Sequence, residues 1–272
     1  MIEFLVFIKL TIAITFVIGL SVLAEHVSPK VAGILSGYPT GSAITLFFFG
    51  LEVSPDYAAK SAVFNMVGLS ASLTFVYAYY IASKYFNKYN IILSSLSAIA
   101  SYFLVVWVLH HIKINTYMAI LIPILFSFLY LYLFKNIKDI NITNKAKLSY
   151  KTLFVRAFFA ALIILLITSV PKFVGPTWAG LFSAFPTTLF PLMLIIHMTY
   201  SKAHVHTVIK NVPIGMFSLI IYSLTVSIVY PMYGIYWGTL ISFATATLYL
   251  LIYKKVRSVI DKFKYAVKVK SK

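Results

Sequence analysis

The chain has no cysteine and only six acidic residues among its 272 positions. Without cysteine, the protein forms neither disulfide bonds nor a metal site built on thiolate ligands. The acidic residues all lie in loops or near the ends of apolar segments: Glu3, Glu25, Glu52, Asp56, Asp139 and Asp261. We therefore expect no carboxylate in the middle of the membrane that would relay protons or bind sodium.

Signatures of enzymes are also missing from the sequence. It has no HExxH zinc motif, no GxSxG nucleophile motif, no phosphate-binding P-loop and no pair of embedded carboxylates. His204 and His206 stand close together, but neither an acidic residue nor a third histidine accompanies them as a zinc site requires. The sequence therefore predicts a protein that is not an enzyme and that uses no cofactor or metal.

Apolar residues dominate what is present. They make up 61% of the chain, whereas charged residues make up 11%. Several apolar runs exceed the roughly 18 residues that mark a membrane-spanning helix. The sequence thus predicts an all-α polytopic membrane protein with about nine transmembrane helices, at residues 4–24, 31–51, 58–83, 90–110, 115–134, 152–171, 178–198, 205–228 and 232–253.

The net charge of +17 follows this predicted topology and does not point to nucleic acid as a partner. When nine spans alternate between two sides, 19 of the 23 basic residues fall on the side that holds the C-terminus. Positive charge collects in the cytoplasmic loops of membrane proteins. We therefore expect an integral inner-membrane (cytoplasmic-membrane) protein with its N-terminus outside and its C-terminus in the cytoplasm.

The C-terminal tail, residues 254–272, alternates basic residues with Val, Ile, Phe and Tyr. This pattern suits a helix that lies on anionic lipids, at about 1 kcal/mol for each basic group. It suits a solvated segment that only sets the topology equally well, so the sequence leaves both interpretations open.

An internal repeat is the most informative feature of the chain. The pattern Val-x-Pro-x-x-Ala-Gly-x-x-Ser-x-Tyr-Pro-Thr at residues 27–40 recurs at residues 174–187, 147 positions later, with Phe in place of Tyr. The register extends without gaps to Lys9 and its counterpart Arg156. We divide the chain into a first repeat with helices one to four, a linking fifth helix with its cytoplasmic loop, a second repeat with helices six to nine, and the basic tail: residues 1–112, 113–150, 151–253 and 254–272.

The two repeats are expected to have inverted topology. Five spans precede the polar linker that ends the first half, so the first span and its counterpart, the sixth, enter the membrane from opposite sides. An alternative alignment pairs the fifth span with the ninth and makes the fourth span the insertion. In both alignments spans one to three run antiparallel to spans six to eight.

Each repeat places a proline inside an apolar helix, Pro39 in one and Pro186 in the other. An interior proline removes a helical hydrogen bond and kinks or breaks the helix. Interrupted helices in matching positions of two repeats are typical of secondary transporters, which bind substrate there near the membrane midplane. We therefore expect a substrate-binding site composed of Ser36, Tyr38, Pro39, Thr40, Ser183, Phe185, Pro186, Thr187, Lys9 and Arg156.

Structural interpretations of the same residues stay open. Gly33, Gly37 and Gly41 recur at four-residue spacing, as in a face for close contact between helices. Lys9 and Arg156 lie near the ends of their spans, where a cation extends to the membrane surface at little cost. In the functional interpretation both cations point inward and, with the N-termini of half-helices, attract an anionic substrate.

The second half resembles a known family. The segment Ala179-Gly180-Leu181-Phe182-Ser183-Ala184-Phe185-Pro186-Thr187-Thr188 and the later Ile195-Ile196-His197 are similar to the GlpM family of small four-helix bacterial inner-membrane proteins. These carry a similar Ala-Gly-Leu, Phe-Pro-Thr and Ile-Ala-His pattern early in their second helix. His197 matches the family histidine, whereas Gly50 in the first half departs from it. The resemblance implies a four-helix unit in the second half and a role in permeation or in envelope polysaccharide export.

Taken together, the sequence predicts a secondary transporter or permease for a small molecule, with an anion as one candidate. It would work by alternating access between the two repeats. A channel lined by the same hydroxyls, a lipid flippase and a non-transporting scaffold for envelope assembly are the alternatives. The expected partners are the lipid bilayer, anionic lipids at the tail and the substrate, and oligomer formation is left open.

Overall fold

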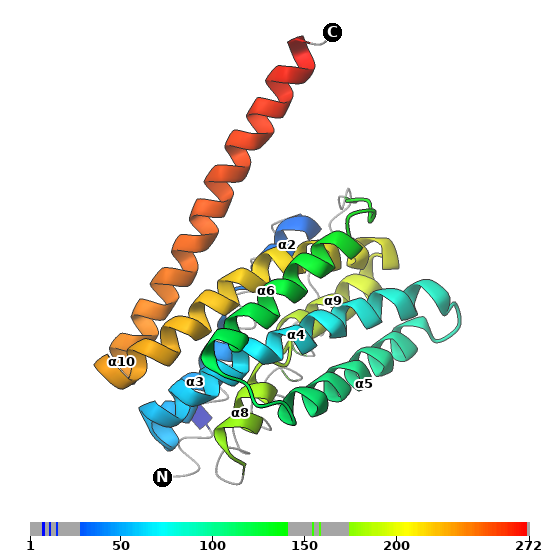
Figure 1. The fold of residues 1–272 in the computed structure, drawn as a ribbon. Helices are drawn as coiled ribbons and strands as arrows, with labels where there is room; N and C mark the ends of the chain where they lie inside the picture. The colour runs from blue at the N-terminus through cyan, green and yellow to red at the C-terminus, as the bar shows by residue number, and fades with distance from the viewer. Residues whose placement is uncertain are drawn as a thin grey trace.

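The computed structural model describes residues 28–140 and 174–270, together with residues 7, 8, 11, 15, 154 and 158. These parts of the chain are helical and contain no strand (Figure 1). The elements with several described residues are α2 (Pro29–Leu35), α3 (Thr40–Glu52), α4 (Pro55–Tyr85), α5 (Asn90–His110), α6 (Thr116–Leu133), α8 (Pro176–Ser183), α9 (Leu189–Thr199) and α10 (Lys202–Lys270).

Five helical segments in the described residues are long and apolar enough to cross a membrane: Pro29–Glu52, Pro55–Tyr85, Asn90–His110, Thr116–Leu133 and Lys202–Val259. The all-α, membrane-type fold expected from the sequence is thus confirmed. The predicted first and sixth spans, residues 4–24 and 152–171, lie almost wholly outside the described residues.

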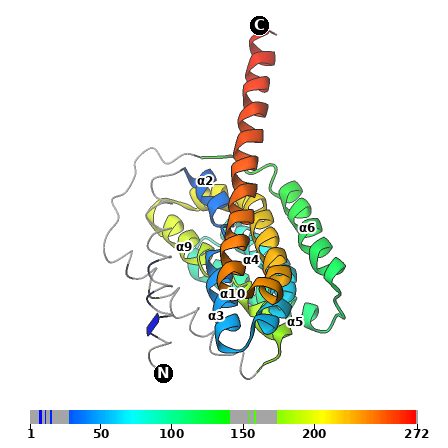
Figure 2. The same cartoon turned by 90° about the vertical axis from the view of Figure 1, so that its left-hand side faces the viewer.

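The helix α10 consists of two arms. Gly234 has φ 74° and ψ 177°, a conformation that side chains disfavour, and it separates residues 202–233 from residues 235–270. Figures 1 and 2 show the second arm folded back across the bundle and then leaving it toward the C-terminus. Hydrogen bonds join the arms at Tyr230 with Thr239 (2.7 Å) and at Tyr249 with the carbonyl of Ile214 (3.0 Å). The sequence placed this turn slightly early, between residues 228 and 232.

Local sequence explains where the helices begin. Ser28 and Ser54 each accept a hydrogen bond at a helix start, and each is followed by proline at the first helical position. Proline suits that position because its missing N–H would have no partner there. Asn115 caps α6 in the same way, accepting from the N–H of Met118 at 2.8 Å.

The helix α4 forms the centre of the bundle: 72% of its most apolar stretch is buried, against 22% in α5 and in α6. Its buried side chains include Phe75 and Tyr79. The outer faces of α5 and α6 expose large apolar side chains, among them Leu104, Trp107 and Phe128. Exposed apolar surface of this extent is expected where lipid, and not water, covers the helices.

The two interrupted helical segments run in opposite directions. Figure 1 shows α2 and α9 toward the upper end of the bundle and α3 and α8 toward the lower end. The chain therefore descends from α2 to α3 but ascends from α8 to α9. They also pack on different partners, because α2 lies against the first arm of α10 and α8 lies against α4.

Glycines bring these pairs into backbone contact. A Cβ added to Gly33 would overlap the carbonyl oxygen of Val208, and one added to Gly180 would overlap the carbonyl oxygen of Ser61. Gly33 and Gly180 are 147 positions apart in the sequence, and so are Ser61 and Val208. A second matched pair is Gly37 against Gly215 and Ala184 against Gly68.

Alanine at either of the first two glycines should destabilise the fold to a similar degree. We expect Gly33→Ala and Gly180→Ala each to lower the free energy of unfolding by about 1–3 kcal/mol, because the added methyl group meets a backbone carbonyl that cannot rotate away. The measurement is equilibrium unfolding in detergent micelles. Gly175→Ala is the control, since an added Cβ there meets nothing within 4 Å, and equal stability of all three variants would contradict the expectation.

Candidate functional site: the crossing of two interrupted helices

Both helix interruptions use the same turn. The N–H of Thr40 donates to the carbonyl of Tyr38 at 2.7 Å, and the N–H of Thr187 donates to the carbonyl of Phe185 at 2.7 Å. Pro39, at the centre of the first turn, has φ −76° and ψ 43°. These are the hydrogen bond and approximate angles of an inverse γ-turn, and proline favours it because its ring fixes φ near −65°.

A serine hydroxyl near each interruption donates to a carbonyl that has lost its helical partner. Ser36 donates to the carbonyl of Gly33 at 2.7 Å, and Ser183 donates to the carbonyl of Gly180 at 2.7 Å. These carbonyls lose their regular helical partner, because the N–H of the residue four positions on bonds elsewhere. The hydroxyls therefore satisfy backbone groups that would be costly to leave unpaired in lipid.

A buried group of four polar side chains lies beside the interruptions and is called here the Asn65 cluster: Ser42, Asn65, Ser183 and Ser223. The Asn65 amide donates to Ser183 at 2.7 Å and to Ser42 at 3.2 Å. Its carbonyl oxygen accepts from Ser223 at 2.7 Å. The cluster thus joins α3, α4, α8 and α10, and all three hydrogen bonds run between side chains that are at most 6% exposed.

The two interruptions meet at a cavity of about 20 Å³. A cavity needs roughly 10–15 Å³ to hold one water molecule, so this one has room for about one. Hydroxyls and backbone groups from both interruptions share its wall with apolar side chains. The lining residues are Ser36, Tyr38, Gly41, Ser42, Leu69, Ser72, Ala184, Phe185, Pro186, Thr187, Thr188, Leu189, Met216 and Leu219.

The predicted site residues divide into three groups. Five of them border the cavity: Ser36, Tyr38, Phe185, Pro186 and Thr187. The other three described residues do not: Pro39 and Thr40 are buried in the turn, and Ser183 belongs to the Asn65 cluster. The two predicted cations, Lys9 and Arg156, lie outside the described residues.

Some residues of the site were not expected from the sequence. Ser72 in α4 lines the cavity and donates to the carbonyl of Ala184. Met216 and Leu219 contribute to the wall from the first arm of α10. Tyr102 in α5 donates to the carbonyl of Leu181 at 2.6 Å, which secures the end of α8. The frequent serines of α4 were the available signal, since small polar residues favour contact between membrane helices.

Three histidines form hydrogen bonds near the ends of helices. His197 bonds through Nδ1 to the hydroxyl of Tyr79 at 2.8 Å. His206 bonds through Nε2 to Ser83 at 2.7 Å, and His204 bonds to Ser201 at 2.9 Å. Within the part of the chain that the structure describes, no three metal-binding side chains come together.

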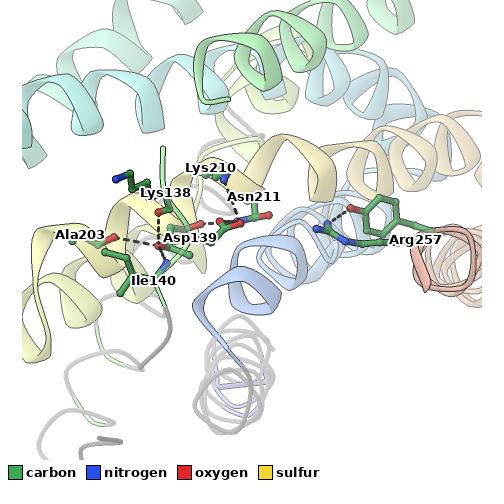
Figure 3. A network of polar contacts seen from close by, with 9 residues as sticks. Lys138, Asp139, Ile140, Ala203, Lys210, Asn211 and Arg257 are labelled. Atoms are coloured by element: carbon green, nitrogen blue, oxygen red, sulfur yellow. Dashed lines mark hydrogen bonds and ion pairs between the residues drawn. The ribbon is translucent and has the colours of Figure 1, made fainter. Parts of the chain in front are cut away.

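A polar network fastens the segment after α6 to the start of α10 (Figure 3). Lys210 forms an ion pair with Asp139 at 3.2 Å, and Asn211 donates to the same carboxylate at 3.4 Å. Thr207 accepts from the N–H of Ile140 at 3.0 Å. Because Asn211 also faces Gly33 of α2, this network supports the contact between α2 and α10.

Comparison of the chain with models of protein families, with curated proteins and with solved structures finds no match. We therefore describe the site from its geometry alone: two proline turns, one polar cluster and one small cavity lie together in the bundle.

Loss of the central amide should weaken the whole crossing. We expect Asn65→Leu to lower the free energy of unfolding by about 3 kcal/mol, because three buried serines lose a partner. Unfolding in detergent micelles measures this change. Asn87→Leu is a control at an exposed asparagine, expected to cost about 1 kcal/mol or less, and an equal loss in both variants would refute the central role of Asn65.

Proposed function

We propose that the protein is a secondary transporter or permease with its substrate site at the crossing of α2–α3 and α8–α9. The observation that carries this proposal is the meeting of two interrupted helices at one cavity lined by polar groups from both. Interrupted helices expose backbone dipoles, and transporters use such dipoles to bind substrate in the middle of the membrane.

The proposal includes two inverted repeats of four helices and one linking helix, nine helices in all. The opposite directions of α2–α3 and α8–α9 support it. So do the equivalent contacts of Gly33 with Val208 and of Gly180 with Ser61. The alignment at an offset of 147 positions relates these two contacts to each other, as a twofold axis in the membrane plane would.

The proposed mechanism is alternating access with two seams. One seam is the contact of α2 with the first arm of α10, reinforced by Asn211 and Asp139. The other is the contact of α8 with α4, reinforced by the hydrogen bond from Tyr57 to the carbonyl of Val174 at 2.8 Å. With both seams closed the cavity has room for about one water, so opening one seam at a time would admit substrate from one side.

The membrane placement and the family belong to the same proposal. The distribution of basic residues supports an inner-membrane location with the C-terminus in the cytoplasm. Five apolar segments of spanning length support the membrane itself. Similarity to the GlpM family rests on residues 179–188 and His197, and it agrees with a function in permeation.

A non-transporting scaffold is the second candidate. The observation in its favour is the tight backbone contact at Gly33, Gly37 and Gly180, combined with a cavity of only about 20 Å³. A scaffold would keep both seams closed permanently. The two candidates therefore differ in whether the cavity is ever reached by water.

Accessibility of the cavity separates these functions. Because the natural chain contains no cysteine, Ser36→Cys places the only thiol of the protein in the cavity wall. No other residue then contributes to thiol labelling. We expect a membrane-impermeant maleimide to label it from either side of oriented proteoliposomes, in a membrane that shows no steady ionic conductance. Tyr117→Cys, at a residue that is 84% exposed, is the control for reagent activity.

Two other labelling results would each indicate a different function. Labelling accompanied by steady single-channel currents would indicate a channel. Failure of the maleimide to reach Ser36→Cys from both sides, while Tyr117→Cys reacts, would indicate a sealed scaffold and end the transport proposal.

The orientation is tested with the same chemistry. Lys113→Cys in the α5–α6 connection should react only from outside, and Lys88→Cys in the α4–α5 connection only from the cytoplasm, because an odd number of crossings separates them and the basic loops stay inside. Both positions are exposed. Labelling of intact cells with the impermeant reagent, before and after lysis, measures the difference, and the reverse pattern would refute the orientation.

A further inference from the structure

Two helix N-termini border the central cavity. The helix α3 has 13 residues and α9 has 11, and both begin directly after a proline turn. Gly41 and Ser42 in the first turn of α3, and Thr188 and Leu189 at the start of α9, line the cavity wall. The partial positive charges of two helix ends therefore act on the same small space.

The backbone donors at these helix ends are free. Among the described residues, the N–H groups of Gly41, Ser42, Thr188 and Leu189 donate no backbone hydrogen bond. The first N–H groups of any helix lack an intrahelical partner. Gly41, Ser42 and Leu189 are buried, and a ligand in the cavity would satisfy their donors, because an unpaired buried donor is costly.

The side chain of Thr187 gives an independent indication of a ligand. It is 2% exposed, and its hydroxyl is buried without a hydrogen-bond partner in the described structure. A Cβ added to Gly41 would overlap this hydroxyl, so it lies directly against the first turn of α3. The absence of a side chain at Gly41 thus makes room for the Thr187 hydroxyl beside the start of α3.

The other buried hydroxyls of the wall are already committed. Ser42 donates to the carbonyl of Ser183 at 3.3 Å, and Ser72 donates to the carbonyl of Ala184. The half-buried Ser36 likewise donates to Gly33. No lining residue is acidic. The two helix ends direct N–H donors at the cavity and no carboxylate opposes them, which favours an anion as the ligand.

We propose that this cavity is a binding site for a small anion of halide size, held by the Thr187 hydroxyl and the N-termini of α3 and α9. The proposal deepens the proposed function and rests on it, since it names the substrate class of the same site. The volume of about 20 Å³ admits an ion close to the size of one water. The partial positive charge of the two helix N-termini repels cations, so the site selects against them.

Chloride nuclear magnetic resonance on the full-length protein in detergent tests this site. We expect the protein to broaden the chloride resonance and sodium fluoride to reverse the broadening, whereas sodium gluconate at the same ionic strength does not. Thr187→Val should weaken chloride binding about tenfold or more, as expected for one lost hydrogen bond to a charged group. Thr187→Ser, which keeps the hydroxyl, should bind within about threefold of the natural protein.

Two further variants distinguish loss of chloride binding from loss of folding. Gly41→Ala fills the space beside Thr187 and should also abolish the broadening. Thr74→Val makes the same chemical change at a hydroxyl that bonds to Ser70 and Tyr130 away from the cavity, and it should leave chloride binding unchanged. Elution volume and thermal unfolding of each variant establish that it is folded.

The outcomes separate this inference from transport itself. Broadening that is absent in the natural protein, or that persists in folded Thr187→Val, means that the cavity holds water only and overturns the anion site, while labelling of Ser36→Cys still decides transport. Broadening that depends on Thr187 in a protein whose Ser36→Cys is sealed from both sides supports the anion site and refutes transport.

Discussion

The structure depends on one constraint, which is that polar backbone groups released inside an apolar bundle must find partners there. Proline breaks each of two helices, and a serine three positions before each proline donates to the carbonyl that the break releases. The turn at Pro39 and the turn at Pro186 have matching hydrogen bonds. The serines satisfy the carbonyls of Gly33 and Gly180 locally, which stabilises the interruptions. The N-termini of α3 and α9, which begin after the two breaks, border the cavity.

Two nearby residues of one motif therefore have different roles. Ser183 is held by Asn65 and by Gly180 and forms part of the framework, whereas Thr187, four residues later, has a buried hydroxyl without a partner. The fixed Asn65 cluster joins four helices beside the cavity and defines its shape. Such a division is what a binding site requires, since rigid surroundings hold the unpaired groups in position for a ligand.

Much of the fold could be predicted from residue patterns. Apolar runs predicted the all-α membrane-type fold, and Pro39 and Pro186 predicted the interruptions at the places where α3 and α9 begin. The candidate site was predicted less completely. Pro39 and Thr40 belong to the expected set but do not line the cavity, and Ser72 from α4 was not in that set. Local chemistry predicts that a helix breaks, but which side chain of the turn faces inward depends on the helices that pack around it.

By itself, the sequence determined the apolar character of the helices, the two proline breaks and the recurrence of one motif around them, because each follows from residue type and spacing along one chain. Only the tertiary structure decided that Gly41 meets Thr187, that Asn65 links serines from three other helices, and that both helix ends border one cavity. Those contacts join residues more than 20 positions apart, most of them far more. Their geometry arises from the close approach of backbones at glycine, which the spacing of residues along one chain does not specify.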